Sequence, residues 1–180
     1  MMKRLMVILA LALMFSCNNS STNETTVASK DTVTEQIDYA YLPENHPPDN
    51  WDKGDQRNIA MVLRSLKGFE TKNIDQAMEP FADTVRWAAD GIDVRMTKDS
   101  LRSMFIDSWQ NMTNIKIKMD DYEAVISKDK KTEYVTLWYK QIVTNTKGEV
   151  DSLSCVDDVR IEKGKITEID EKTRRYPAKI

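Results

Sequence analysis

Apolar residues between positions 51 and 180 recur first at the spacing of helices and later at the spacing of strands. Asp55 can cap a first helix, and Gly68 is expected to end it. The apolar face of this helix carries Ile59, Val62, Leu63 and Leu66. Steps of three and four residues are typical of a helix that packs one side against a core.

A second helix is predicted to begin at Asn73, with Gln76 as a capping-box partner, and Pro80 should distort its last turn. Its apolar positions are Ile74, Ala77, Met78 and Phe81. A short hairpin follows, with strands expected at 84–88 and 92–96 around a tight turn.

The third predicted helix has the strongest helical pattern in the chain, and Thr97 can cap it. One side of it presents Leu101, Met104, Phe105, Ser108, Trp109 and Met112. From residue 115 the period of the apolar residues changes to two. Strands are therefore predicted at 115–126, 134–143, 150–162 and 166–172.

This order of three helices with an inserted hairpin, followed by four antiparallel strands, indicates an α+β fold. We expect the three N-terminal helices to pack on one face of a curved antiparallel β-sheet. The patterned region, residues 51–180, has the usual size of one domain with a single core.

The N-terminus has the layout of a signal peptide over residues 1–16. Lys3 and Arg4 precede an uncharged apolar run over 5–15, which ends at Ser16 and Cys17. The run has about half of the ~20 residues that a membrane-spanning helix needs. The end of the run resembles the lipobox of bacterial lipoproteins, in which the cysteine is acylated and becomes the new N-terminus. An ordinary signal peptide with an incidental cysteine is the alternative.

Residues 17–50 are expected to form the lipidated Cys17 and a flexible tether, because the segment 18–36 is polar and lacks aromatic residues. The formal net charge is −3, and loss of Lys3 and Arg4 with the signal peptide makes the chain more acidic. A mildly acidic chain without basic runs is a poor candidate for binding nucleic acid. We therefore expect a secreted protein, anchored to the bacterial cell envelope by its lipid alone.

The chain contains two cysteines and one histidine. With Cys17 acylated, only Cys155 remains, so no intramolecular disulfide is possible, and Cys155 is interpreted as a small buried hydrophobe. His46 stands in the proline-rich segment 41–51, where no second ligand lies at a coordinating spacing. We expect neither a metal nor a cofactor.

Two segments carry a resemblance to a known superfamily. IDQAMEPFADTVRWAADG (74–91) is similar to the second helix and first hairpin of the nuclear transport factor 2-like superfamily, and VDDVRIEKGKITEIDE (156–171) is similar to its last two strands. This superfamily includes SnoaL-like polyketide cyclases, ketosteroid isomerases and scytalone dehydratase. The resemblance implies a cone-shaped, cystatin-like domain over 51–180, a mostly apolar pocket between sheet and helices, and a homodimer formed through the outer face of the sheet.

Asp157 is the anomalous residue of the predicted inner face. Strand parity places Leu153, Cys155, Asp157 and Val159 on one face, which is expected to be buried. Burial would raise the pKa of the Asp157 carboxyl, which can then act as a general base or acid. Alternatively, a β-bulge or edge position lets Asp157 reach solvent or pair with Arg160 or Arg174.

The expected pocket lining is largely aromatic and consists of Trp87, Phe105, Trp109, Trp138, Tyr139 and Cys155. Trp138 and Tyr139 are adjacent in a strand, so at most one of the two faces the pocket. The predicted core has no histidine, which excludes the His–Asp pair that the resemblance implies for dehydratases. The possible partners of Asp157 are Tyr122, Tyr134 and Tyr139.

Two functions remain open. The favoured one is a lipid-anchored, noncatalytic domain that binds a small apolar ligand or a protein partner. The alternative is an enzyme of the isomerase, cyclase or dehydratase kind, with Asp157 as the base in a proton transfer on a small hydrophobic substrate.

Overall fold

A computed structural model describes residues 37–176 of the chain. The predicted signal peptide, Cys17 and the tether as far as residue 36 lie outside the described residues. One compact unit begins at Tyr41. Nearly every side chain between residues 37 and 50 is exposed. Among residues 37–176, no helix has the length and apolarity needed to span a membrane.

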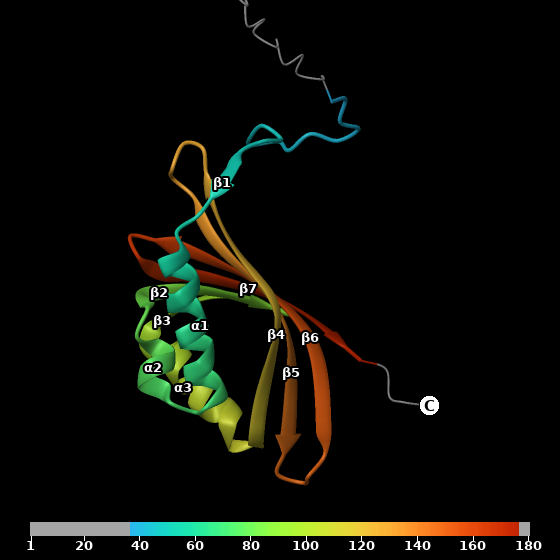
Figure 1. The fold of residues 1–180 in the computed structure, drawn as a ribbon. Coiled ribbons are helices and arrows are strands. Elements are labelled where there is room, and N and C mark those ends of the chain that lie inside the picture. The colour runs from blue at the N-terminus through green and yellow to red at the C-terminus, as the bar shows by residue number, and fades with distance from the viewer. Residues whose placement is uncertain (1–36, 177–180) are drawn as a thin grey trace, which may run out of the picture. The chain divides into compact units, whose positions relative to one another are not determined.

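Helices lie together on one side of a curved sheet (Figure 1). The elements, in chain order, are β1 (Trp51–Lys53), α1 (Gln56–Glu70), α2 (Ile74–Met78), β2 (Phe81–Ala89), β3 (Ile92–Thr97), α3 (Lys98–Gln110), β4 (Met112–Ser127), β5 (Glu133–Asn145), β6 (Val150–Glu162) and β7 (Lys165–Arg175). The predicted α+β class is confirmed.

The sheet has the strand order β1-β4-β5-β6-β7-β2-β3. Every neighbouring pair is antiparallel except β2 and β7, which run parallel. The sequence pattern predicted the hairpin and the four long strands, but it predicted neither β1 nor the parallel pairing. These two features depend on contacts between distant segments, which a local pattern does not encode.

Two predicted helix starts are confirmed. The Asp55 carboxylate accepts a hydrogen bond of 2.8 Å from the backbone N–H of Arg57 at the start of α1. The Thr97 hydroxyl accepts one of 3.1 Å from the backbone N–H of Ser100 at the start of α3. In each case the side-chain oxygen satisfies an N–H group that has no partner within the helix.

The end of α1 differs from the prediction. Gly68 lies inside the helix, which continues to Glu70 and is capped at Thr71. A Cβ atom at position 68 would stand 2.4 Å from the backbone nitrogen of Ala77. Gly68 is therefore explained by the close approach of α2 to α1 rather than by a helix end.

The second helix is shorter than predicted. It ends at Met78, and Phe81, expected on its apolar face, begins β2. Proline at position 80 cannot donate a backbone hydrogen bond, so the helix does not continue through it. Asn73 caps the helix by accepting from the backbone N–H of Gln76, but the Gln76 side chain donates to the carbonyl oxygen of Arg64 on α1. The predicted capping box is therefore only half formed.

A β-bulge in β4 explains how the apolar pattern of this strand passes from odd to even positions. The register against β5 shifts between Met119 and Asp121. Ile115 and Ile117 precede the shift, and Ala124 follows it. The extra residue keeps both sets of side chains on the face that the helices cover.

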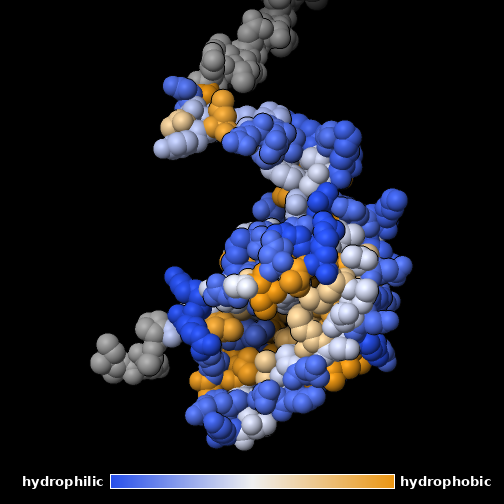
Figure 2. Space-filling view, turned by 180° about the vertical axis from the view of Figure 1, so that it is seen from behind, coloured by the Kyte–Doolittle hydropathy of each residue, from blue (hydrophilic) through white to orange (hydrophobic). Residues whose placement is uncertain are grey.

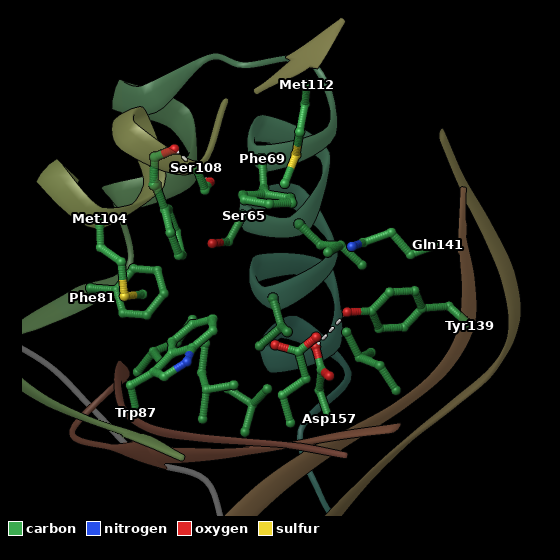
Figure 3. A pocket seen from close by; sticks show the side chains of 18 residues that line it. Ser65, Phe69, Phe81, Trp87, Met104, Ser108, Met112, Tyr139, Gln141 and Asp157 are labelled. Carbon is green, nitrogen blue, oxygen red and sulfur yellow. Dashed lines mark hydrogen bonds between the residues drawn. The ribbon is translucent and has the colours of Figure 1, made fainter. Parts of the chain in front are cut away.

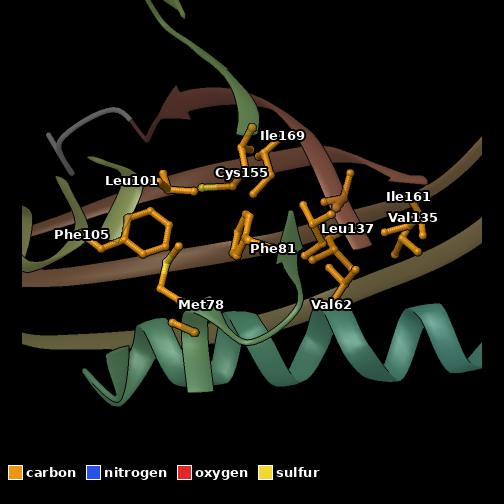
Figure 4. Packing of buried hydrophobic residues seen from close by; sticks show 14 of the residues in the cluster. Val62, Met78, Phe81, Leu101, Phe105, Val135, Leu137, Cys155, Ile161 and Ile169 are labelled. Atoms are coloured by element: carbon orange, nitrogen blue, oxygen red, sulfur yellow. The ribbon is translucent and has the colours of Figure 1, made fainter. Parts of the chain in front are cut away.

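The hydrophobic core lies between the helices and this inner face of the sheet (Figure 4). Helix residues such as Val62, Leu101 and Phe105 meet strand residues such as Leu137 and Ile169. The core is continuous with the wall of a cavity.

Candidate functional site

A cavity of about 260 Å³ lies between the helices and the inner face of the sheet. This is close to the lower limit of about 300 Å³ for typical small-molecule sites. On the face seen in Figure 2, hydrophobic residues gather around a hollow between mainly hydrophilic surfaces. The cavity is lined by Val62, Ser65, Leu66, Phe69, Phe81, Trp87, Met104, Phe105, Ser108, Met112, Leu137, Tyr139, Gln141, Asp157, Val159, Ile166, Ile169 and Glu171 (Figure 3).

Asp157 lies in the middle of the sheet wall of this cavity. It is only 7% exposed, and its register neighbours are Leu137 on β5 and Glu171 on β7. The Tyr139 hydroxyl donates a hydrogen bond of 2.9 Å to Oδ2 of Asp157 (Figure 3). Oδ1 of Asp157 is buried and has no hydrogen-bond partner in the described part of the chain. One oxygen of the carboxyl group therefore remains available to a bound molecule.

The surroundings of Asp157 favour the protonated carboxyl. Burial is the main cause, the nearby Glu171 carboxylate is the second, and together they raise the pKa of Asp157 to about 8. The hydrogen bond from Tyr139 acts in the opposite direction. At pH 7 the Asp157 carboxyl is thus mainly neutral.

The predicted alternative for Asp157 does not hold. Its side chain forms no ion pair with Arg160 or Arg174 in the residues that the structure describes, and Arg160 pairs instead with Glu162. Of the three candidate partners, Tyr139 is the one that contacts Asp157. Tyr122 is exposed, and Tyr134 packs against Trp51.

Glu171 is a second carboxyl group on the cavity wall. It stands opposite Asp157 in the antiparallel register of β6 and β7. Side chains directly opposite each other in such a pair have Cβ atoms about 4.5–5.5 Å apart. Burial raises the pKa of Glu171 as well. Two neighbouring acids therefore share one apolar cavity.

The remaining polar groups of the lining are neutral. The hydroxyls of Ser65 and Ser108 donate to the backbone carbonyl oxygens of Ala77 and Phe105, respectively. The buried Gln141 lies two residues beyond Tyr139 and faces the cavity from β5. The polar groups of the sheet wall are thus Tyr139, Gln141, Asp157 and Glu171.

Four of the residues predicted to form the site line the cavity together: Trp87, Phe105, Tyr139 and Asp157. The other three do not. Trp109 is buried in the core, where its ring centroid lies 5.7 Å from that of Phe69. Trp138 lies on the opposite face of β5 from Tyr139, because successive side chains of a strand alternate.

Cys155 is also absent from the cavity lining. It is 1% exposed, and its short side chain lies in the core beside the longer Tyr139 across the strand pair. Burial raises the pKa of its thiol to about 12, so the thiol is protonated at neutral pH. Cys155 is therefore part of the core.

The prediction from sequence missed Glu171 and Gln141. Each lies two residues after an inner-face residue of the same strand, Glu171 after Ile169 and Gln141 after Tyr139. The period of two was sufficient to find both. Residue type indicates the opposite for both, because glutamate and glutamine side chains are usually exposed.

No metal site is found in the described residues, since no group of three or more His, Cys, Asp or Glu side chains is arranged to hold an ion. His46, outside the cavity, places Nδ1 3.0 Å from the carbonyl oxygen of Pro47, and its ring packs edge-on against Trp51.

Solved structures with the same arrangement of helices and strands establish the fold. The chain has the nuclear transport factor 2-like fold, as the sequence resemblance predicted. A nuclear transport factor 2-like protein of unknown function from Burkholderia pseudomallei is similar, with a TM-score of 0.51 and 17% identity over 66% of this chain and 90% of that one.

Two further solved structures are similar to this chain. AclR, a putative hydroxylase from Streptomyces galilaeus, has a TM-score of 0.56 and 11% identity, and the match covers 69% of this chain and 83% of that chain. An LEH-like epoxide hydrolase from M. tuberculosis has a TM-score of 0.54 and 12% identity, and the match covers 66% of this chain and 84% of that chain. No protein family model and no curated protein matches the chain. At such identities the likeness concerns the fold, and function must be argued from the site.

Proposed function

We propose that this chain is a cell-envelope enzyme, held by a lipid on Cys17, whose cavity transfers a proton on a small, mainly apolar substrate. Asp157 is the acid–base group. The observation that carries the proposal is the position of Asp157, buried in an apolar cavity with Oδ1 unpartnered.

The environment of Asp157 suits proton transfer near neutral pH. A general base is most effective when its pKa lies close to the working pH, and the pKa of Asp157 is raised to about 8. An ordinary exposed aspartate is a far weaker base. The structure of the cavity thus supports a role that the residue type alone does not.

Each polar group on the sheet wall has a defined part in the proposed reaction. The ionised Asp157 takes a proton through Oδ1 from a carbon next to a substrate carbonyl. The electron pair of that C–H bond forms a C=C bond, and the π electron pair of the carbonyl moves to its oxygen to give an enolate. Tyr139 fixes the carboxyl by donating to Oδ2. The amide N–H groups of Gln141 can donate to the developing oxyanion. Asp157 then returns the proton to carbon.

The noncatalytic alternative is a cavity that binds a ligand without changing it. Pocket, apolar walls and fold suit both functions equally. The feature that favours the enzyme is the buried Asp157 carboxyl, because a pKa of about 8 suits proton transfer near neutral pH and binding alone does not require it.

Proton transfer can be measured without knowing the natural substrate. A panel of small cyclic and aryl ketones is incubated with the full-length protein in D₂O, and proton NMR follows the loss of the signal at the carbon next to the carbonyl. We expect exchange above the uncatalysed rate for ketones that bind. Asp157→Asn should lower the enzymatic rate by about 10²-fold or more, the usual contribution of a general base.

Asp158→Asn is the matched control. Asp158 is the next residue of β6 and points to the outer face of the sheet. Its carboxylate accepts hydrogen bonds from the Thr136 hydroxyl and the Lys172 ammonium group. The Asp158→Asn variant should exchange the substrate proton at the rate of the unmodified protein. An Asp157→Asn variant that also exchanges it at the unmodified rate would contradict the proposal. Ketones that bind the cavity without any exchange would support the noncatalytic alternative.

A further inference from the structure

The cavity contains two acidic side chains and no basic one. Among its lining residues, Asp157 and Glu171 are cross-strand neighbours, and none is Lys, Arg or His. Within the described residues, Glu171 forms no ion pair or side-chain hydrogen bond, although other acids of β6 and β7 pair with Lys172 or Arg86 on the outer face. Basic side chains thus pair with the acids on the outer face of these strands, whereas none lines the cavity.

Such an arrangement costs stability in the empty protein. Buried acids are normally paired, because removing a carboxylate from water is expensive and its attraction to a cation offsets that cost. Asp157 is more than nine-tenths buried and leaves Oδ1 without a partner. A buried acid that has no cationic partner within the protein is expected where a bound ligand supplies the positive charge.

The other walls of the cavity suit an organic cation. The Phe105 ring lies at the centre of an aromatic group, with ring centroids 5.2 Å from Phe69, 5.6 Å from Trp87 and 6.4 Å from Phe81. Aromatic side chains bury an apolar body, and their faces attract a positive charge. An anionic ligand would meet two acids and no cation.

We propose that the substrate of this cavity carries a positively charged amino group on a small apolar body, and that Glu171 binds this group beside Asp157. The inference rests on the proposed function in taking the cavity as the substrate site, and it adds the chemical class of the substrate. Glu171 holds the ammonium group, and Oδ1 of Asp157 stays free to take the proton from carbon.

Binding of the ammonium group has a consequence for Asp157. A positive charge between the two acids favours their ionised forms, so binding should release protons to the solvent near pH 7. The other titratable groups close to Asp157 are Tyr139 and Cys155, both of which are neutral at this pH. Asp158 and Lys172 pair with each other on the outer face. The released protons therefore report mainly on Asp157, whose carboxyl is largely neutral at pH 7 before the ligand binds.

Three matched probes test the charge preference: 2-phenylethylamine, 2-phenylethanol and phenylacetate. Calorimetry with the full-length protein at pH 7 measures their affinities, and repeating it in buffers of different ionisation enthalpy gives the number of protons released. We expect the amine to bind at least about tenfold more tightly than the alcohol, the phenylacetate not to bind, and the amine to release protons.

Glu171→Gln keeps the size of the side chain and removes its charge. We expect this variant to lose about tenfold or more in amine affinity and to keep its affinity for the alcohol. Asp170→Asn is the control, because Asp170 is the preceding residue of β7 and pairs with Lys172 on the outer face. It should bind the amine as the unmodified protein does.

Amine affinity equal to or below that of the alcohol, no binding by any probe, or an unchanged amine affinity in the Glu171→Gln variant would each overturn the inference. Binding is measured here without turnover, so the two proposals fail separately. A protein that prefers the amine but shows no exchange that depends on Asp157 upholds this inference and contradicts the proposed enzyme.

Discussion

Asp157 is kept neutral at pH 7 by its surroundings rather than by a counter-ion. The apolar core removes water from the carboxyl group, the Glu171 charge opposes a second charge, and Tyr139 supplies a single hydrogen bond. A neutral carboxyl costs less to bury than a carboxylate, so the empty protein tolerates Asp157 without a cation although Oδ1 lacks a partner. The same surroundings make the stability of the protein depend on pH.

We expect the free energy of unfolding to fall as the pH rises from about 4 to 8. Over this range the native Asp157 keeps a proton that the unfolded chain loses, because its pKa is raised from 3.8 to about 8. Stability from this group is fully present below pH 4 and is lost at up to about 1.4 kcal/mol per pH unit as the pH rises. Urea denaturation at several pH values, followed by circular dichroism, measures the dependence.

Asp157→Asn provides the comparison, since an amide has nearly the shape of the neutral carboxyl and does not titrate. The variant should lose most of this decline and be more stable than the unmodified protein at pH 8. Parallel curves for the two proteins would show that Asp157 titrates normally.

At the level of elements, the crossing of α1 and α2 depends on one missing side chain. Gly68 lets the backbone of α2 approach α1, and the Gln76 side chain and the Ser65 hydroxyl bridge the two helices. This contact positions the α1 residues, Ser65 among them, that line the cavity.

Gly68→Ala should lower the free energy of unfolding by about 1–3 kcal/mol, because its Cβ would stand 2.4 Å from the Ala77 nitrogen. Helix propensity alone predicts the opposite, a gain of about 1 kcal/mol. The control is Ala60→Gly at an exposed position of α1, which should cost about 1 kcal/mol. Thermal denaturation of both variants distinguishes the two effects, and a stabilised Gly68→Ala variant would refute the close approach.

Elements governed by local chemistry were predictable from the sequence. The caps at Asp55 and Thr97 and the strand of residues 150–162 follow from side chains within a few positions. Gly68 was misassigned because the residue that requires it, Ala77, belongs to another helix. The β1 strand was missed because its pairing partner lies more than 70 residues away on β4.

The alternation of side chains along each strand predicted part of the candidate site, because it gives the face on which a residue lies. Parity identified Asp157 and separated Tyr139 from Trp138. It did not reveal that Glu171 stands opposite Asp157, because the register of β6 and β7 contains a shift near Ile161. Whether a carboxyl group is paired depends on the side chains that the fold brings next to it, and local sequence patterns do not predict these neighbours.

On the scale of the whole molecule, we propose that two copies associate through the outer face of the sheet. Trp138 and Val156 are register neighbours there and are only partly buried. Trp138→Glu should convert a dimer into a monomer, because it places a charge in an apolar contact. Light scattering measures the mass, and Ser103→Glu, which adds the same charge at an exposed position of α3 on the opposite side of the sheet, should leave it unchanged. A monomeric unmodified protein would exclude this dimer.

The lipid on Cys17 is proposed to hold the molecule at the membrane. The formal net charge is −3 and becomes more negative without Lys3 and Arg4, so the mature chain has no electrostatic attraction to anionic lipid. Two acyl chains on one cysteine are sufficient for stable anchoring.

We expect Cys17→Ala to abolish labelling by an alkyne fatty acid in cells and to move the protein out of the membrane fraction. Cys155→Ala, which removes the other cysteine, should keep both the label and the membrane location. A Cys17→Ala protein that stays labelled would mean that the lipid is attached elsewhere. One that is unlabelled yet membrane-bound would mean that the domain itself, or the uncleaved apolar run over residues 5–15, binds the bilayer.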